Sequence, residues 1–157
     1  MSQTLSKTKP VTIFAEDIMT EIVDVINQKM LIGQVAHLML RNRVSGYPVV
    51  NDRRRVVGII TLTDLLTLLD RIVDENKNKT RKKTIAGLHK KITEYKDLPV
   101  AQFMSKNVIN LSPKTPLDEI ISAVANWNIH TFPVMEGRKL VGIIGRHDII
   151  NATFTFG

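Results

Sequence analysis

Apolar residues along the chain form short runs between polar turns, and most of these runs occur twice. Two pairs of Val- and Ile-rich runs each flank a short polar turn, a pattern that predicts a β-hairpin. The runs lie at 44–50 and 56–61 around the turn 51–55, and at 130–135 and 140–145 around the turn 136–139. One further short strand is predicted upstream of each hairpin, at 21–26 and at 107–111.

Helical periodicity accompanies both hairpins. In the first half, one helix is predicted with its apolar face at Leu31, Val35, Leu38 and Met39. In the second half, Thr115 is the expected N-cap and Pro116 the first helical residue. The face of that helix is expected at Leu117, Ile120, Ile121, Val124 and Trp127. A leucine-rich stretch at 65–73 predicts a closing helix, and short helical lead-ins are expected to end at Met19 and Met104.

The recurrence of these elements indicates an internal repeat. "VVGIITLTDLL" at 56–66 returns as "LVGIIGRHDII" at 140–150. A constant offset relates Met19 to Met104 and Pro48 to Pro133, and it falls by one residue after the next turn. The chain is therefore interpreted as a tandem duplication of a β-α-β-β-α unit with mixed α and β structure. The first unit is expected at 10–73, a linker with a connecting helix at 74–99 and the second unit at 100–157. Because a unit of about 50 residues buries little surface alone, the two are expected to pack together.

Composition restricts the compartment and the chemistry. Of the 157 residues, 43% are hydrophobic, 24% are charged and only 5% are aromatic, which predicts an aliphatic core in a soluble protein. The absence of cysteine excludes disulfides, thiolate zinc sites and cysteine nucleophiles, and it fits the reducing cytoplasm. No signal-peptide core and no apolar run long enough to span a membrane is present, so a cytoplasmic protein without a membrane anchor is expected.

The net charge of +7 comes from one segment of the chain. Residues 77–91 contain seven Lys and Arg without an acidic residue, and the remaining 15 basic residues equal the 15 acidic ones. This segment is either a solvated connector or a surface that binds nucleic acid or another polyanion, with the arginines at 53–55 as a supplement. Further along the linker, apolar residues predict an amphipathic helix with its face at Ile85, Leu88, Ile92 and Tyr95.

Three motifs in order give the chain a family resemblance. A lead-in ending in "IMT", an "SGYPVV" strand and "GIITLTDLL" stand in the first unit, and "QFMS", "HTFPVM" and "GIIGRHDII" stand in the second. This order resembles a tandem pair of cystathionine-β-synthase (CBS) domains, a Bateman module. The resemblance implies two CBS units packed about a pseudo-twofold axis, and often a disc-shaped homodimer. It also implies a regulatory module that needs no cofactor and binds AMP, ATP, NAD or S-adenosylmethionine in clefts between the units, with AMP or ATP expected first.

The strand-to-helix corner of the first unit offers polar groups for a nucleotide. A carboxylate at Asp64 can accept two hydrogen bonds from a ribose diol, and Thr61 and Thr63 offer hydroxyls beside it. The resemblance implies that Asp64 binds ribose and that the hydroxyl of Thr63, and after it that of Thr61, contacts ribose or phosphate. The alternative is structural, because Thr-x-Thr-Asp before a helix is also an N-capping sequence.

Further residues match the family's base-binding wall and phosphate contacts. The wall positions are Ile22, Val23, Tyr47, Pro48 and Ile60, each of which alternatively belongs to the core. Arg43 is placed to reach a phosphate, and otherwise is a solvated surface residue.

The second corner keeps the carboxylate at Asp148 but has Gly145 and His147 in place of the two threonines. His147 is a candidate donor to a ribose oxygen or phosphate. His130 stands where the resemblance implies a phosphate-facing histidine in some members of the family, and it is alternatively a capping or surface residue. The cleft built around Thr63 and Asp64 is therefore expected to bind more tightly than the one at Asp148.

No catalytic motif accompanies these residues. None of the four histidines forms a metal-binding motif, and no nucleophile elbow, Walker loop or dinucleotide-binding glycine motif is present. The prediction is a stand-alone, non-enzymatic regulatory module that senses an adenosine-containing ligand and signals to a partner protein in trans. The alternative is nucleic-acid or anionic-surface binding through 77–91.

Overall fold

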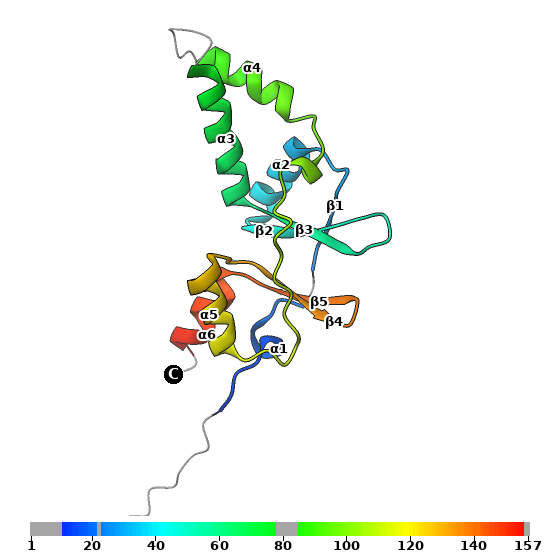
Figure 1. The fold of residues 1–157 in the computed structure, drawn as a ribbon, viewed down its shortest axis with the longest axis vertical. Coiled ribbons are helices and arrows are strands. Elements are labelled where there is room, and N and C mark those ends of the chain that lie inside the picture. Colours follow the sequence, from blue (N-terminus) through cyan, green and yellow to red (C-terminus); the bar gives the residue numbers. More distant parts are fainter. Residues whose placement is uncertain (1–10, 22, 78–84, 156–157) are drawn as a thin grey trace, which may run out of the picture.

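The computed structural model of the chain describes residues 11–21, 23–77 and 85–155. Two α/β units lie one above the other along the longest axis (Figure 1). In the first unit, β1 pairs parallel with β2, and β2 pairs antiparallel with β3. Its elements are β1 (Ile26–Asn27), α2 (Ile32–Asn42), β2 (Gly46–Val50), β3 (Val56–Thr61) and α3 (Leu62–Lys77). In the second unit, β4 and β5 form an antiparallel pair. The elements there are α5 (Leu117–Trp127), β4 (Phe132–Glu136), β5 (Lys139–Ile144) and α6 (Arg146–Thr155).

The two predicted hairpins are confirmed, but the strands upstream of them are shorter than predicted. The strand expected at 21–26 begins only at Ile26, because Val23 and Asp24 line a cavity instead of pairing with a strand. The strand expected at 107–111 is reduced to a single bridge between Leu111 and Val134. Only Leu111 reaches the edge of β4, where its N–H donates to the carbonyl of Pro133.

Helix α5 differs from the prediction in its start and in its buried face. Pro116 is the N-cap and the helix begins at Leu117, because the Thr115 hydroxyl accepts a hydrogen bond from the Ser112 N–H and closes the preceding turn. Ile120 is fully buried, whereas Trp127 is 65% exposed. The periodicity therefore located the helix correctly, but not the edge of its buried face.

Each unit has its own aliphatic core. Buried residues of the first core come from β1, α2, β2, β3 and the segment after α4, and include Ile26, Val35, Met39, Val49, Ile60 and Val100. Those of the second come from α1 (Ala15–Ile18), the segment before α5, α5, β4, β5 and α6, and include Ala15, Leu111, Ile120, Phe132, Val134 and Ile144. Aliphatic side chains fill both cores almost entirely, as the scarcity of aromatic residues predicts.

The lead-in of each repeat packs on the opposite unit. Helix α1 (Ala15–Ile18) of the first repeat lies in the core of the second unit, and the 3-10 turn η1 (Val100–Gln102) of the second repeat lies against the core of the first. Bridges between Thr20 and Ile143, and between Ser105 and Ile59, complete this exchange. Because each lead-in crosses over, the two halves of the duplication interlock about a pseudo-twofold axis.

A methionine follows each lead-in and packs on a glycine of the opposite hairpin. A Cβ at Gly58 would lie 2.6 Å from the Met104 sulfur, and one at Gly142 would overlap the Met19 sulfur. Glycine is therefore required at both crossing points by close approach, which explains why both copies of the repeated phrase contain it.

The linker forms a helical arm with the end of the first unit. Helix α4 (Ile85–Tyr95), predicted from its apolar spacing, packs on the long helix α3. The Tyr95 hydroxyl lies 2.9 Å from a carboxylate oxygen of Glu75, and the Arg71 guanidinium lies over the Tyr95 ring. Four of the seven basic residues of the run 77–91 fall on 78–84, which lie outside the described residues. None of the described helices is both long enough and apolar enough to cross a membrane.

Candidate functional site

Two cavities lie at the junction of the units, and each takes residues from both repeats. Cavity 1, of about 240 Å³, is lined by the first repeat's corner at 61–64 and by 128–131 of the second. The crossing segment adds Ser105 and Asn107 to its lining. Thus the corner of one repeat faces the segment before the first hairpin strand of the other.

Cavity 2 has the reciprocal construction. Its volume is about 370 Å³, and its lining joins the second repeat's corner at 145–148 to residues 43–48 of the first. The crossing segment contributes Thr20, Val23 and Asp24. The pseudo-twofold axis therefore exchanges the two cavities as it exchanges the lead-ins.

This exchange redistributes the residues that the sequence analysis grouped together. Cavity 1 contains Thr61, Thr63, Asp64 and His130, and cavity 2 contains Val23, Arg43, Tyr47, Pro48, His147 and Asp148. The wall expected beside Asp64 instead lies beside Asp148, because the repeats contribute corner and wall to different cavities. Ile60 is fully buried in the first core and lines neither cavity. Tyr47, which is 3% exposed in the same core, and Pro48, which is also fully buried, border cavity 2, so the alternative assignment as core residues is observed for all three. Ile22 lies outside the described residues.

The corner of cavity 1 is closed by a capping box. The Asp64 Oδ2 atom accepts hydrogen bonds from the Thr61 N–H at 2.7 Å and from the Thr61 hydroxyl at 2.9 Å. The Thr61 hydroxyl in turn accepts the Asp64 N–H at 3.3 Å. These reciprocal bonds satisfy donors at the start of α3 and hold the carboxylate at the cavity wall. The capping role considered for these residues is thus observed, and Thr61 is less free for a ligand than the sequence suggests.

Burial raises the pKa of the Asp64 carboxyl above its ordinary value, although the bonds from Thr61 oppose this shift. In the described part of the chain, these bonds use Oδ2 and none uses Oδ1. The second oxygen of Asp64 therefore remains an acceptor for the hydroxyls of a ligand.

The corner of cavity 2 is simpler. The Asp148 Oδ2 atom accepts one hydrogen bond, from the Gly145 N–H at 2.8 Å. Glycine at the N-cap has no hydroxyl, so the reciprocal half of the box is missing. The carboxylate position is the same as in the first repeat, but fewer bonds hold it.

Arg43 and Asn128 occupy equivalent positions after α2 and α5, and each lines a cavity. Both have left-handed backbone conformations, with φ of 53° and 51°. Asparagine tolerates this conformation, whereas arginine there is strained by about 1 kcal/mol. Arg43 therefore projects a charge into the lining of cavity 2 from a backbone position that disfavours it.

Sequence reasoning missed three residues that line both cavities. Ser45, Thr131 and Arg146 occur in the lining of cavity 1 and of cavity 2, so the cavities adjoin at these side chains. Burial and the charge of Arg146 together lower the pKa of His130. Arg146 is exposed, and no signal in a single repeat reveals that it borders both cavities.

Within the described ranges, no group of three or more acidic, histidine or cysteine side chains is arranged to hold a metal ion. The cavity linings instead combine hydroxyls, carboxylates, guanidinium groups and short apolar walls. Such a combination fits an organic ligand with a polyol and an anionic group.

Comparison with known proteins identifies the repeat. Two stretches, 15–71 and 100–154, match the CBS domain. The chain belongs to the CBS domain family. The CBS domain-containing protein CBSX1, a chloroplastic protein of Arabidopsis thaliana, is 24% identical over 84% of this chain and 59% of its own length. A homoserine O-acetyltransferase of Methanococcus vannielii is 27% identical over 87% of this chain, which is 24% of the enzyme. This CBS pair thus spans less than two thirds of these relatives, and only about a quarter of the one named as an enzyme.

Solved structures share the fold of this CBS pair. The CBS-domain protein ATU1752 of Agrobacterium tumefaciens has a TM-score of 0.72 at 20% identity, covering 90% of this chain and all of that one. The CBS domain pair of protein MJ0100, solved with 5′-methylthioadenosine and S-adenosyl-L-methionine, has a TM-score of 0.71 at 20% identity, with 94% of this chain and all of that one covered. CBSX2, solved with AMP, has a TM-score of 0.68 at 22% identity, with 91% and 97% covered. The expected architecture of two CBS units is therefore confirmed.

Proposed function

We propose that this CBS pair is a non-enzymatic regulatory module that senses an adenosine-containing ligand in the cavities between its units. The observation that carries the proposal is the construction of each cavity, which brings a corner carboxylate of one repeat to the wall of the other. The matched structures of CBSX2 and MJ0100, solved with AMP and with adenosine-derived ligands, support the same ligand class. AMP and ATP are the first candidates, followed by NAD and S-adenosylmethionine.

Cavity 2 is proposed as the principal nucleotide site. Its volume of about 370 Å³ falls within the usual range for small-molecule sites, and cavity 1 at about 240 Å³ falls below it. Tyr47 and Pro48 supply an apolar wall for a base, Asp148 an acceptor for ribose and Arg43 a cation for phosphate. This assignment reverses the order expected from the threonines, because the wall and the cation accompany Asp148. Cavity 1 is proposed as a second, weaker site.

A ligand in either cavity touches both units and both crossing segments. Occupancy therefore favours one packing of the units over others, and a regulated protein in trans that distinguishes these packings receives the signal. Cytoplasmic location is also proposed, because a composition without cysteine fits a reducing compartment.

The experiment is calorimetric titration of the wild-type chain with AMP, ATP, NAD and S-adenosylmethionine. We expect saturable binding of at least one of them, and a loss of about tenfold or more in affinity when Asp148 is replaced by Ala. Asp52→Ala is the matched control, since Asp52 lies outside both cavities. Absence of binding of all four ligands at millimolar concentration by the folded protein would overturn the proposal.

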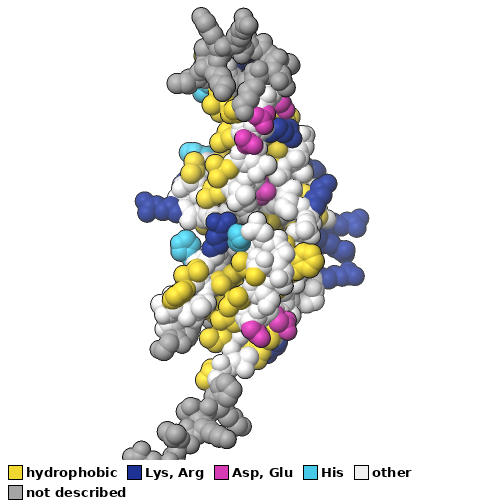
Figure 2. All heavy atoms as spheres, turned by 60° about the vertical axis from the view of Figure 1, so that its left-hand side comes forward, with side chains coloured by type: hydrophobic (Ala, Val, Ile, Leu, Met, Phe, Trp, Pro, Cys, Tyr) yellow, Lys and Arg dark blue, Asp and Glu magenta, His cyan; other side chains and the backbone are white. Residues whose placement is uncertain are grey.

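A homodimer is part of the proposal. Apolar side chains on α3, α5 and α6 are exposed, and Figure 2 shows hydrophobic side chains in both halves of the face formed by these helices. The most exposed are Leu66, Trp127, Ile150 and Phe154, at 58–77%. A second copy would cover such a patch. In light scattering, Leu66→Glu with Phe154→Glu should give a monomer, whereas Leu40→Glu, an exposed leucine on α2, should not. A monomeric wild-type chain at high micromolar concentration would contradict the dimer.

The alternative function, polyanion binding, has one specific observation in its favour. The loop between β2 and β3 carries Arg53, Arg54 and Arg55, and none of the three is in an ion pair with a described residue. Arg54 has φ of 60°, a left-handed conformation that glycine or asparagine would adopt without strain. A strained position occupied by a charged residue motivates a functional hypothesis.

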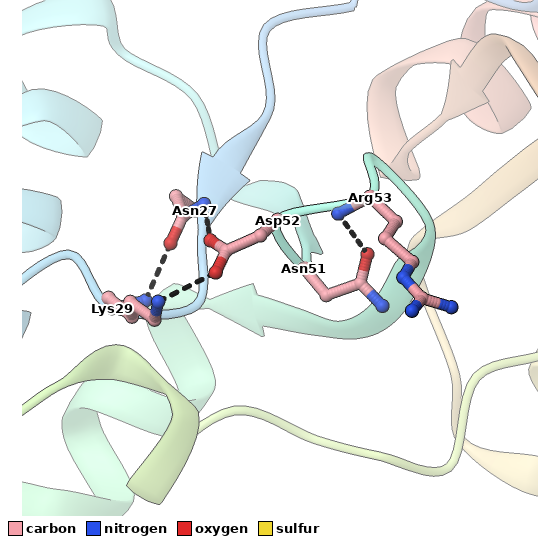
Figure 3. A network of polar contacts seen from close by, with 5 residues as sticks. All are labelled: Asn27, Lys29, Asn51, Asp52 and Arg53. Atoms are coloured by element: carbon pink, nitrogen blue, oxygen red, sulfur yellow. Dashed lines mark hydrogen bonds and ion pairs between the residues drawn. The ribbon is translucent and has the colours of Figure 1, made fainter.

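The acidic residue of this loop does not neutralise the arginines. The Asp52 carboxylate pairs with the Lys29 Nζ at 2.6 Å and accepts a hydrogen bond from Asn27, and Figure 3 shows the Arg53 side chain directed away from it. The bond from Lys29 is the main reason that the pKa of Asp52 lies below its ordinary value. Asn51 accepts the N–H groups of Arg53 and Arg55, which fixes the shape of the loop.

This alternative predicts salt-dependent binding of duplex nucleic acid. Replacing the three arginines by Gln should weaken binding and reduce its dependence on salt, and neutralising the cations of 77–83 tests the contribution of the linker separately. A variant set that binds like the wild type at low salt would remove this alternative.

A further inference from the structure

The two cavities share one cation, the guanidinium of Arg146. Arg146 is the first residue of α6 and lines cavity 1, cavity 2 and the groove along α6. Ser45 and Thr131 also line both cavities, so Arg146 stands where the cavities adjoin. Its charge acts on His130 in cavity 1, while His147 and Asp148 of its own helix line cavity 2.

The duplication does not provide a second residue of this kind. The position equivalent to Arg146 in the first repeat is Leu62, the first residue of α3, which lines cavity 1 alone. Arg146 is also the only Lys or Arg in the lining of cavity 1 among the described residues, whereas cavity 2 additionally has Arg43. The linings of the two adjoining cavities thus contain two arginines, of which Arg43 lines cavity 2 alone and Arg146 lines both.

We infer that Arg146 binds the phosphate of a nucleotide in either cavity, so that phosphorylated ligands compete for it and fill the cavities one at a time. Guanidinium is suited to this role because its fixed fork of donors matches a phosphate and its charge is permanent. A phosphate held in cavity 2 removes the one strong cation from cavity 1 and adds a negative charge beside it. An adenosine ligand without phosphate does not need the guanidinium of Arg146, so it binds to each cavity independently.

This inference rests on the proposed function and specifies its ligand classes. It predicts that one molecule of a phosphorylated ligand binds per chain, whereas two molecules of an uncharged adenosine ligand bind per chain. The competition follows from a single side chain at the junction and requires no larger change in the fold.

The test is calorimetric stoichiometry with two probes, AMP and adenosine, on the wild type and two variants. The wild type should bind one AMP per chain, with the second AMP weakened by about tenfold or more, and two molecules of adenosine, of which the one in cavity 1 is weaker by less than that factor. Arg146→Leu, which copies the first repeat, should weaken AMP by about tenfold or more while leaving adenosine within about twofold. Leu62→Arg, which gives cavity 1 a cation of its own, should raise the AMP stoichiometry to two.

The outcomes separate the inference from the proposed function. Two AMP sites of equal affinity in the wild type, or unchanged AMP affinity in Arg146→Leu, would overturn the inference that Arg146 serves both cavities. If adenosine still binds in that case, the proposed function stands. Failure of both probes to bind a folded wild-type chain would overturn the proposed function and this inference with it. Because Arg146 is exposed, Arg146→Leu should fold, and Arg146→Lys provides a variant that retains the charge without the fork.

Discussion

Cavities 1 and 2 arise from the same duplicated sequence, yet they differ where a ligand would touch them. In both repeats a methionine packs on a hairpin glycine of the opposite unit, and a carboxylate at the cavity corner caps the following helix. They differ in the residues beside the carboxylate and in the wall that faces it, where cavity 2 has Arg43 and cavity 1 has Asn128. The groups shared by the repeats maintain the fold, and the groups that differ define two ligand environments.

The comparison also shows that a carboxylate at the corner is weak evidence for a ligand. Asp64 and Asp148 both have a complete structural reason to be present, since each closes the first turn of a helix. The discriminating features are instead the side chains opposite the corner, and these come from the other repeat.

The largest expected effect concerns the crossing glycines. A Cβ at Gly58 would lie 2.8 Å from the backbone carbonyl of Ser105 as well as 2.6 Å from the Met104 sulfur, and the carbonyl cannot move without breaking its bridge to Ile59. At Gly142, the three atoms nearest to an added Cβ all belong to the side chain of Met19, and none of the three is a backbone atom. Gly58→Ala should therefore destabilise the fold by about 3 kcal/mol and Gly142→Ala by about 1 kcal/mol.

Urea unfolding followed by circular dichroism measures the difference between these glycine variants. Gly137→Ala is a control of another kind, because Gly137 has open space around it but a φ of 63°, so its effect reports backbone strain alone. Equal losses of unfolding free energy from Gly58→Ala and Gly142→Ala would contradict the prediction, because they would show that the Ser105 carbonyl adds no cost at Gly58.

Removal of the two corner carboxylates should change the free energy of unfolding by different but smaller amounts. Asp64 accepts two hydrogen bonds from Thr61 and donates one in return, whereas Asp148 accepts one from Gly145. Asp64→Ala should reduce the free energy of unfolding by about 1–2 kcal/mol and Asp148→Ala by about 0.5–1 kcal/mol. Thermal and urea unfolding without ligand provide the measurement.

Ligand affinity is expected to follow the opposite order from stability. Asp148→Ala should weaken nucleotide binding more than Asp64→Ala, because cavity 2 contains the wall and the additional arginine. Asp64→Asn retains an oxygen acceptor for the Thr61 N–H and is the control for loss of the cap. A larger affinity loss from Asp64→Ala would restore the order expected from the threonines.

Much of the fold could be predicted from the sequence because local signals and the repeat agree. The hairpins follow from Val- and Ile-rich runs around polar turns, and helix α4 follows from the spacing of Ile85, Leu88, Ile92 and Tyr95. The errors lie where tertiary contacts decide. Leu111 makes one bridge instead of a strand, and Trp127 lies outside the buried face although the helical spacing admits it.

The candidate site could be predicted residue by residue, but not its assembly. Ten of the twelve predicted residues line a cavity, because strand-to-helix corners and the segments before strands meet at the same edge of each unit. Their grouping depends on the exchange of lead-ins, which a one-dimensional repeat does not reveal. Arg146 was overlooked as a cavity residue for the same reason, since it borders both cavities only when the two units pack together.

A moderate effect is expected at the left-handed residues that line the cavities. Arg43→Asn copies Asn128 and relieves the strain of arginine at φ of 53°, so the free energy of unfolding should rise by about 0.5 kcal/mol. The same change removes a cation from cavity 2 and should weaken AMP there severalfold, with adenosine unaffected. Asn128→Arg is the reciprocal variant, and it should lose stability. A stability gain accompanied by full AMP affinity would exclude Arg43 as a phosphate contact.

The smallest expected effect is a pH dependence confined to cavity 1. Burial first, and the charge of Arg146 second, lower the pKa of His130, so the folded protein takes up this proton less readily than the unfolded chain does. Between the lowered pKa and the ordinary value near 6.5, the unfolded state binds more protons. Stability is therefore lost as the pH falls through that window, and it is regained as the pH rises above it.

His130→Ser isolates this contribution, because Ser45 occupies the equivalent position in the first repeat. The stability of the wild type relative to His130→Ser should fall between pH 7.5 and 5, and the difference removes titrations common to both proteins. In Arg146→Leu the pKa of His130, followed by NMR, should rise toward 6.5 but not reach it, because burial is the larger cause. An unchanged pKa in that variant would show that Arg146 does not act on cavity 1, and the two cavities would then be electrostatically separate.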